Sequence, residues 1–125
     1  MQNQKMQIEG APSSAPFLEV KIANTFLTRL AGLMFQKKLP QGTGLLLVPC
    51  NSVHMCFMRF SIDVIYLDKD YKIIEIVKNL KPWIGLSLCS PAWATLEMTD
   101  GDAERCGLAV GKKLLIQEID DLVNP

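Results

Sequence analysis

The order of apolar and polar residues along the chain predicts short strands. In residues 17–23, FLEVKIA, the two kinds of residue alternate with the period of a half-buried strand. Similar short runs follow, separated by Gly, Pro, Asn or Asp residues that favour turns. These runs span residues 44–48, 53–58, 62–67, 72–77, 94–98 and 112–118. The pattern therefore predicts a meander of β strands, with the turn DKD at residues 68–70 closing a hairpin.

Two short stretches have helical character instead. Residues 25–34 repeat apolar side chains at the spacing of an amphipathic helix, after a capping Asn24 or Thr25. Residues 99–106, TDGDAERC, carry capping and acidic residues before Arg105, which predicts one or two helical turns. Neither stretch supplies the crossover helices that a parallel βαβ sheet requires. We therefore expect a mainly β fold: a small, partly closed antiparallel barrel or sandwich with one or two short helices.

The chain of 125 residues is long enough to bury a core of its own. Residues 1–16 are rich in Gln, Ser, Ala and Pro and show no clear period, so they predict a flexible tail in which residues 7–9 could form a short edge strand. Residues 17–125 are expected to form a single β-rich domain.

The charge and the hydropathy of the chain argue against some classes of binding partner. The 13 basic and 13 acidic residues give a formal net charge of zero, and the basic residues are scattered. This distribution argues against binding to nucleic acid or to an anionic membrane. The sequence has no signal-peptide pattern and no apolar window of membrane-spanning length. We therefore expect a soluble, cytoplasmic protein whose four cysteines are reduced.

The only histidine lies in a strand-like run beside a thiol. A strand over residues 53–58 would place His54, Cys56 and Met58 on one face. The run lacks the closely spaced Cys and His pairs of structural zinc sites, so we predict no metal and no cofactor. Cys56 and His54 could form a nucleophile and its base, which leaves a thiol-dependent enzyme open as an alternative.

Two carboxylates interrupt apolar strands. Asp63 lies within SIDVIYL and Glu97 lies between Leu96 and Met98. A buried carboxylate requires a partner, and arginine suits this role because its planar guanidinium can bond both oxygens. The candidate partners are Arg29, Arg59 and Arg105. These charged residues could form internal pairs or bond backbone groups to hold the helix and the turn onto the barrel, or they could line a cleft in which a ligand replaces one partner.

Three ordered blocks of this chain resemble the family catalogued as domain of unknown function 192. They are Arg29-x-x-Gly32-Leu33-Met34, then FMRFSIDVIYLDKDYKII at residues 57–74, then LEMTDGDAERCGLAVGKKL at residues 96–114. The resemblance covers about residues 20–115. Where the family commonly reads Phe-Trp-Met-Lys-Asn-Thr, this chain has Arg59 in place of the Lys and lacks the Asn-Thr pair. The resemblance implies a compact, mostly β domain whose biochemical activity is not established.

These observations favour a non-catalytic binding or accessory module that recognises a small polar ligand or a peptide. Its cleft would be bordered by ionisable residues at apolar β positions: Arg29, His54, Arg59, Asp63, Glu97 and Arg105. One alternative is an enzyme, either thiol-dependent through Cys56 and His54 or a hydrolase that uses Asp63 and Glu97. Another is a structural interaction domain that pairs an exposed β edge with a second chain. Trp83 and Trp93 could border a binding surface, although packing over the barrel mouth is the expected role.

Overall fold

The computed structural model describes residues 2–11, 18–23, 41–55 and 58–118. Nine strands and one short helix form its regular structure in these ranges. The strands are β1 (Gln2–Ile8), β2 (Leu18–Ala23), β3 (Thr43–Leu47), β4 (Ser52–His54), β5 (Ile62–Leu67), β6 (Ile73–Leu80), β7 (Leu86–Leu88), β8 (Ala94–Thr99) and β9 (Leu114–Glu118), and the helix is α2 (Asp102–Arg105). The fold is therefore mainly β, as the residue pattern predicts.

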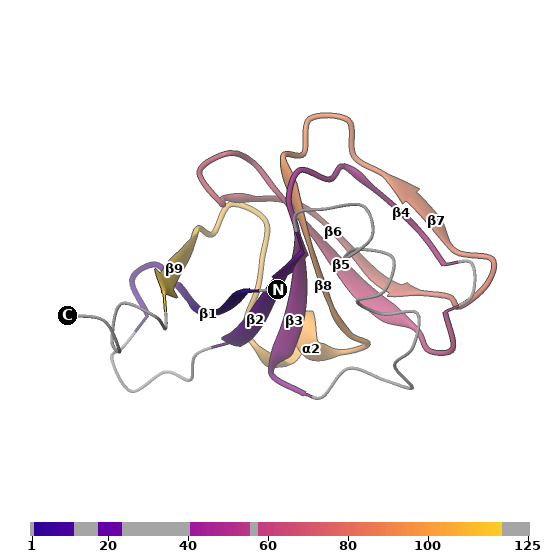
Figure 1. Cartoon of the computed structure of the whole chain (residues 1–125), viewed down its shortest axis with the longest axis horizontal. Coiled ribbons are helices and arrows are strands. Elements are labelled where there is room, and N and C mark those ends of the chain that lie inside the picture. The colour runs from indigo at the N-terminus through magenta and orange to yellow at the C-terminus, as the bar shows by residue number, and fades with distance from the viewer. Residues whose placement is uncertain (1, 12–17, 24–40, 56–57, 119–125) are drawn as a thin grey trace.

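Seven strands form one curled sheet in the order β6-β5-β8-β3-β2-β1-β9 (Figure 1). The two end strands of this sheet are β6 and β9. They meet at their first residues, next to an antiparallel bridge between Lys72 and Lys113. Two backbone hydrogen bonds extend this closure: Ile73 N–H donates to Lys112 at 2.8 Å, and Leu114 N–H donates to Tyr71 at 2.9 Å. The closure is limited to this end of the strands, which confirms the expected partly closed barrel.

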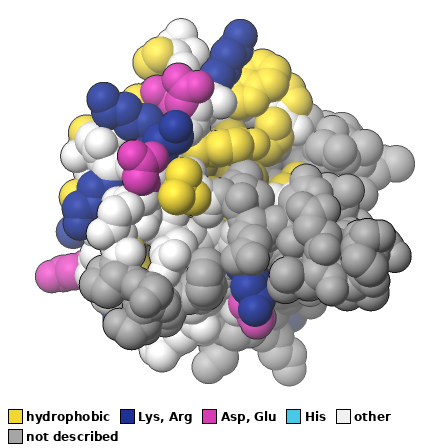
Figure 2. All heavy atoms as spheres, turned by 90° about the vertical axis from the view of Figure 1, so that its left-hand side faces the viewer, with side chains coloured by type: hydrophobic (Ala, Val, Ile, Leu, Met, Phe, Trp, Pro, Cys, Tyr) yellow, Lys and Arg dark blue, Asp and Glu magenta, His cyan; other side chains and the backbone are white. Residues whose placement is uncertain are grey.

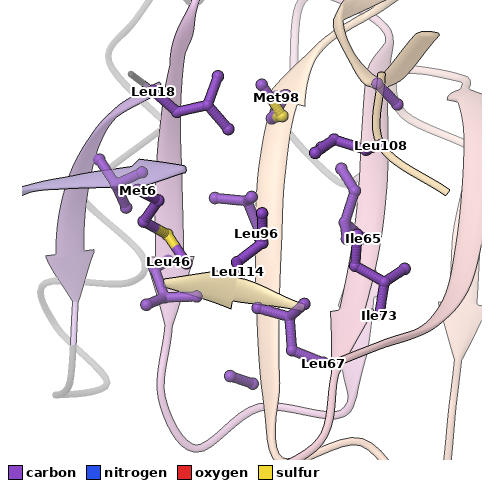
Figure 3. Packing of buried hydrophobic residues seen from close by; sticks show 13 residues of the cluster. Met6, Leu18, Leu46, Ile65, Leu67, Ile73, Leu96, Met98, Leu108 and Leu114 are labelled. Atoms are coloured by element: carbon purple, nitrogen blue, oxygen red, sulfur yellow. The ribbon is translucent and has the colours of Figure 1, made fainter. Parts of the chain in front are cut away.

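The concave face of the sheet holds the larger core cluster (Figure 3). Side chains from both ends of the sheet meet there, since Met6 of β1 and Leu114 of β9 pack with Ile65 of β5 and Leu96 of β8. Successive residues of a strand point to opposite faces, so Ile65 and Leu67 face this cluster while Val64 and Tyr66 face away. Burial of these apolar side chains is the main source of stability for the curled sheet.

The convex face is covered by a second, two-stranded sheet made of β4 and β7. We call these two strands the outer layer. Beneath them lies a separate cluster that contains Val53, Met55, Val64 and Tyr66. The Tyr66 hydroxyl donates to Ser87 Oγ of β7 at 2.8 Å, which ties the outer layer to the main sheet. Both faces of β5 are therefore buried, and all six of its residues are inaccessible to water.

The structure differs from the predicted elements in four places. Residues 2–8, expected within a tail, form β1 and pair with both β2 and β9. β2 and β3 pair in parallel, which the segment between them is long enough to allow. The strand expected over residues 53–58 ends at His54, and the strand expected over residues 72–77 continues to Leu80 as β6. β7 lies within residues 78–93, whose Pro and Gly residues predict a long connection or an irregular strand. The helix expected over residues 25–34 lies outside the described residues.

Gly85 allows the outer layer to pack closely, and its substitution gives a first prediction. A Cβ at this position would lie 2.5 Å from the Lys81 carbonyl oxygen and 2.8 Å from the side chains of Leu80 and Met55. We expect Gly85→Ala to lower the free energy of unfolding by about 2 kcal/mol, because overpacking forces backbone to shift. Urea unfolding followed by circular dichroism measures this change. Ser90→Ala, an exposed control in the same segment, should change stability by less than about 0.5 kcal/mol; equal effects would contradict the crowding.

Candidate functional site

Asp63 is buried in β5 and its carboxylate binds backbone groups. Its Oδ1 accepts the N–H of Asn79 at 3.0 Å, and its Oδ2 accepts the N–H groups of Gly101 and Ala103, each at 3.0 Å. Asn79 and Gly101 have φ angles of 57° and 92°, so both lie in the left-handed region. Three backbone donors satisfy this buried anion. Asp63 thus connects the end of β6 to the turn and first residues of α2.

Arg105 pairs with a residue that the sequence does not single out. Its guanidinium forms an ion pair with Asp102, one turn earlier in α2. Asp102 is fully buried, and its Oδ2 accepts the N–H of Gly42 at 2.9 Å. The DGDAER stretch carries a hint of this contact, since Asp102 and Arg105 are three residues apart and share one helical face. The hydrogen bond from Gly42 holds α2 against the turn that leads into β3, and Arg105 pairs with the same carboxylate.

Glu97 faces the opposite side of the sheet from Asp63. In β8 it lies opposite Leu45 of β3 and Val64 of β5, both of which belong to the cluster beneath the outer layer. Asp63 instead lies opposite Met98, which belongs to the concave cluster. Burial away from water raises the pKa of Glu97 to about 8. The two carboxylates therefore cannot meet across one substrate, and a hydrolase would need a different pair of groups.

The other predicted site residues that the structure describes, His54 and Arg59, lie at the surface. Both residues are exposed, and His54 lies opposite Leu86 in the outer layer. Arg29 and Cys56 lie outside the described residues. The five predicted residues that the structure describes therefore divide into two that make internal contacts around α2, one buried acid beneath the outer layer and two exposed bases.

Thiol and metal chemistry find little support in the described ranges. Cys50, Cys89 and Cys106 are free thiols, and burial raises the pKa of Cys89 and of Cys106. A raised pKa lowers the thiolate fraction and so lowers reactivity. Burial also raises the pKa of Tyr66, although its hydrogen bond to Ser87 opposes this shift. No three His, Cys, Asp or Glu side chains of the described residues are placed to hold a metal ion.

A surface that the sequence only partly indicates lies on the outer layer. Ile84, Leu86 and Leu88 are 84%, 75% and 66% exposed, and the neighbouring Trp83 is 56% exposed. Ser87, between the two leucines, points inward to Tyr66. Trp93 is less exposed, at 38%, and the Lys69 ammonium lies 5.2 Å from the centre of its ring. We call Ile84, Leu86 and Leu88 the β7 apolar face.

Apolar side chains also reach the surface on another side of the molecule. Figure 2 shows the side that lies at the left of Figure 1, where hydrophobic side chains gather near the top beside both basic and acidic groups. Val110 lies shortly before β9 and is 63% exposed. Leu115 lies within β9 and is 46% exposed.

No helix in the described part of the chain is both long and apolar enough to cross a membrane. The single described helix, α2, has four residues.

Comparison with known proteins identifies relatives of unassigned activity. The UPF0127 protein PF1050 of Pyrococcus furiosus is 34% identical over 102 residues, which cover 78% of this chain and 85% of that protein. The UPF0127 protein PH1112 of Pyrococcus horikoshii is 40% identical over 70 residues, and these span 52% of this chain but only 58% of the relative.

A solved structure shares the fold. The crystal structure of a protein of unknown function from Novosphingobium aromaticivorans superposes with a TM-score of 0.76 at 23% identity, covering 92% of this chain and 86% of that chain. At this identity the likeness concerns the fold alone. The profile of DUF192, described as uncharacterized ACR, COG1430, matches residues 7–116. The match spans most of the 125 residues, and the chain belongs to the DUF192 family, whose curated members carry the name UPF0127.

Proposed function

We propose that this protein is a non-catalytic binding module that takes an extended peptide segment of a partner protein. One observation carries the proposal: the β7 apolar face is exposed on a strand whose outer side has no partner strand in the described residues. Apolar side chains on an open strand suit peptide recognition, because the backbone provides hydrogen bonds and the side chains provide contact area. The small polar ligand considered from the sequence remains a second possible occupant.

The internal contacts of the charged residues support a binding role over catalysis. Backbone N–H groups donate to Asp63, and Arg105 forms an ion pair with Asp102. Both residues therefore contribute to the fold. Asp63 and Glu97 face opposite sides of the sheet, which weighs against the hydrolase alternative. The raised pKa of the Cys89 and Cys106 thiols weighs against thiol chemistry at those positions.

A peptide-display selection tests the proposed function. We expect random peptides displayed on phage to be enriched on the purified protein, and synthetic copies to bind with micromolar affinity, as is common for short extended peptides. The double variant Leu86→Ser, Leu88→Ser should weaken their binding at least about tenfold, because it removes the apolar contact area. Fluorescence anisotropy measures the affinity, and thermal unfolding verifies that the variant remains folded.

A control variant tests whether the loss of binding is specific to the β7 apolar face or follows from the removal of any exposed leucine. Leu115→Ser alters an exposed leucine of β9 and should leave peptide binding unchanged. Failure to enrich any peptide, or equal affinity for the wild type and the Leu86, Leu88 double variant, would contradict the proposed function.

A further inference from the structure

The backbone of β7 presents its free groups on the side away from β4. The register pairs Ser52 with Leu88, Val53 with Ser87 and His54 with Leu86. At the ends of this ladder, Cys89 N–H donates to Asn51 at 2.8 Å and Met55 N–H donates to Gly85 at 2.9 Å. Alternate residues of an antiparallel strand direct their backbone groups to opposite sides. Because residues 85, 87 and 89 face β4, the N–H and C=O groups of Leu86 and Leu88 face outward.

The outward groups have the spacing that an added strand uses. Leu86 and Leu88 are two residues apart, so their four backbone groups can form hydrogen bonds with one extended segment. Leu86 and Leu88 are both highly exposed, so nothing in the described part of the chain covers them. In the described residues, β4 is the one strand that pairs with β7. This edge therefore can accept a third strand without any displacement of the two that are present.

The segments that build and flank the outer layer carry basic groups, although the whole chain is neutral. Residues 51–61 and 76–93, which build and flank this layer, contain His54, Arg59, Lys78 and Lys81 and no Asp or Glu. The ammonium of Lys81 lies 3.2 Å from Asn79 Oδ1, and the Lys81 carbonyl accepts the N–H of Gly85 just before β7. Lys81 is exposed and its contact with Gly85 places it beside the start of β7, whereas Lys78 is exposed on β6. This end of the strand favours an anionic partner.

The opposite end of β7 has a different charge. The carboxylate of Glu75 contributes to the raised pKa of Cys89, after burial, which puts a negative charge within electrostatic reach of the residue that follows β7. The surroundings of the two ends of this edge therefore differ, with Lys81 beside its start and the carboxylate of Glu75, on β6, in the surroundings of Cys89. A peptide strand laid along this edge is favoured in the direction that brings its carboxylates to the lysine end.

An anionic membrane surface would satisfy the apolar and basic residues but not the backbone. Insertion of β7 into lipid would bury the outward N–H and C=O groups of Leu86 and Leu88 without partners, and unpaired backbone groups are strongly disfavoured in an apolar medium. A peptide strand supplies partners for these groups. We infer that β7 binds an extended, acidic peptide segment of a partner protein as the third strand of the β4–β7 sheet, with its carboxylates beside Lys78 and Lys81. This inference rests on the proposed function and specifies the chemistry of the peptide.

Synthetic peptides of matched length test this inference. We expect an extended peptide of alternating valine and glutamate to bind at least about tenfold more tightly than its valine and lysine counterpart at low salt, and added salt to reduce the difference. N-methylation of every second amide, in one of the two possible phases, should abolish binding because it removes the donors that face β7. Fluorescence anisotropy with the full chain measures each affinity.

Two charge variants and a lipid probe complete the test. Lys78→Gln with Lys81→Gln should remove most of the preference for glutamate, whereas Lys72→Gln with Lys113→Gln should retain it. Peptides from the display selection that bind β7 without a preference for acids, or without sensitivity to N-methylation, would overturn this inference and leave the proposed function intact. Absence of any peptide binding would overturn both. Binding to phosphatidylserine vesicles without peptide binding would assign the surface to a membrane instead.

Discussion

Asp63→Ala is expected to lower the free energy of unfolding by about 4 kcal/mol, because the substitution leaves three backbone donors without their acceptor. A hydrogen bond to a charged group contributes more than one between neutral groups, and two of these donors precede or lie within α2. The helix has only four residues and cannot be stable by itself. Urea unfolding at pH 7, followed by circular dichroism, measures the change in free energy.

Two further variants establish the cause of that loss. Asp63→Asn keeps acceptor capacity in one oxygen but points an amide donor at backbone N–H groups, so it should cost roughly half as much. Asp100→Asn changes an exposed carboxylate next to the same turn and should cost less than about 0.5 kcal/mol. A loss below about 1 kcal/mol for Asp63→Ala would show that the three contacts do not hold β6 and α2 in place.

Glu97 is expected to make the protein less stable as the pH rises. The ordinary glutamate pKa is 4.5, and burial raises the pKa of Glu97 to about 8 in the folded protein. Between these two values the folded state holds a proton that the unfolded state releases, so the free energy of unfolding falls with increasing pH. Below about 4.5 both states are protonated, and above about 8 both are ionised, so the destabilisation is then complete. Its full size is at most on the order of 4 to 5 kcal/mol.

Glu97→Gln isolates this contribution because the amide has nearly the same shape and does not ionise. Near pH 5 the variant and the wild type should have similar stability, and at pH 8.5 the variant should be more stable by several kcal/mol. Urea unfolding at a series of pH values measures the difference between them. Glu104→Gln, at an exposed position, should show no such trend. A difference that stays constant from pH 5 to 8.5 would rule out a raised pKa for the buried carboxyl.

Asp63 and Glu97 show which properties of a residue the sequence predicts and which it does not. Each carboxylate interrupts an apolar strand, and each is buried as that context predicts. The sequence leaves open whether Asp63 pairs with an arginine or bonds backbone groups, because either depends on contacts between distant segments. The structure provides backbone amides. The alternation within one strand follows from sequence. The two carboxylates face opposite sides of the sheet because Asp63 of β5 pairs with Met98 of β8, whereas Glu97 pairs with Val64.

β1 shows a limit of a different kind. Its residues, QNQKMQI, are mostly polar and resemble a tail, yet Gln4 and Met6 are buried. The strand exists because β2 and β9 supply backbone partners on both sides. Polar residues can occupy such a strand because sheet hydrogen bonds involve the backbone and require no particular side chain.

The sequence by itself determined the β class, the positions of most strands and of α2, the family, and the burial of Asp63 and Glu97. These properties depend on local alternation, turn residues and short motifs, which are written in neighbouring positions. The tertiary structure alone decided the parallel pairing of β2 with β3, the partners of Asp63 and Arg105, and the exposure of the β7 apolar face. Each of these depends on which distant strands meet and in which register, and residue patterns within a strand do not specify that alignment.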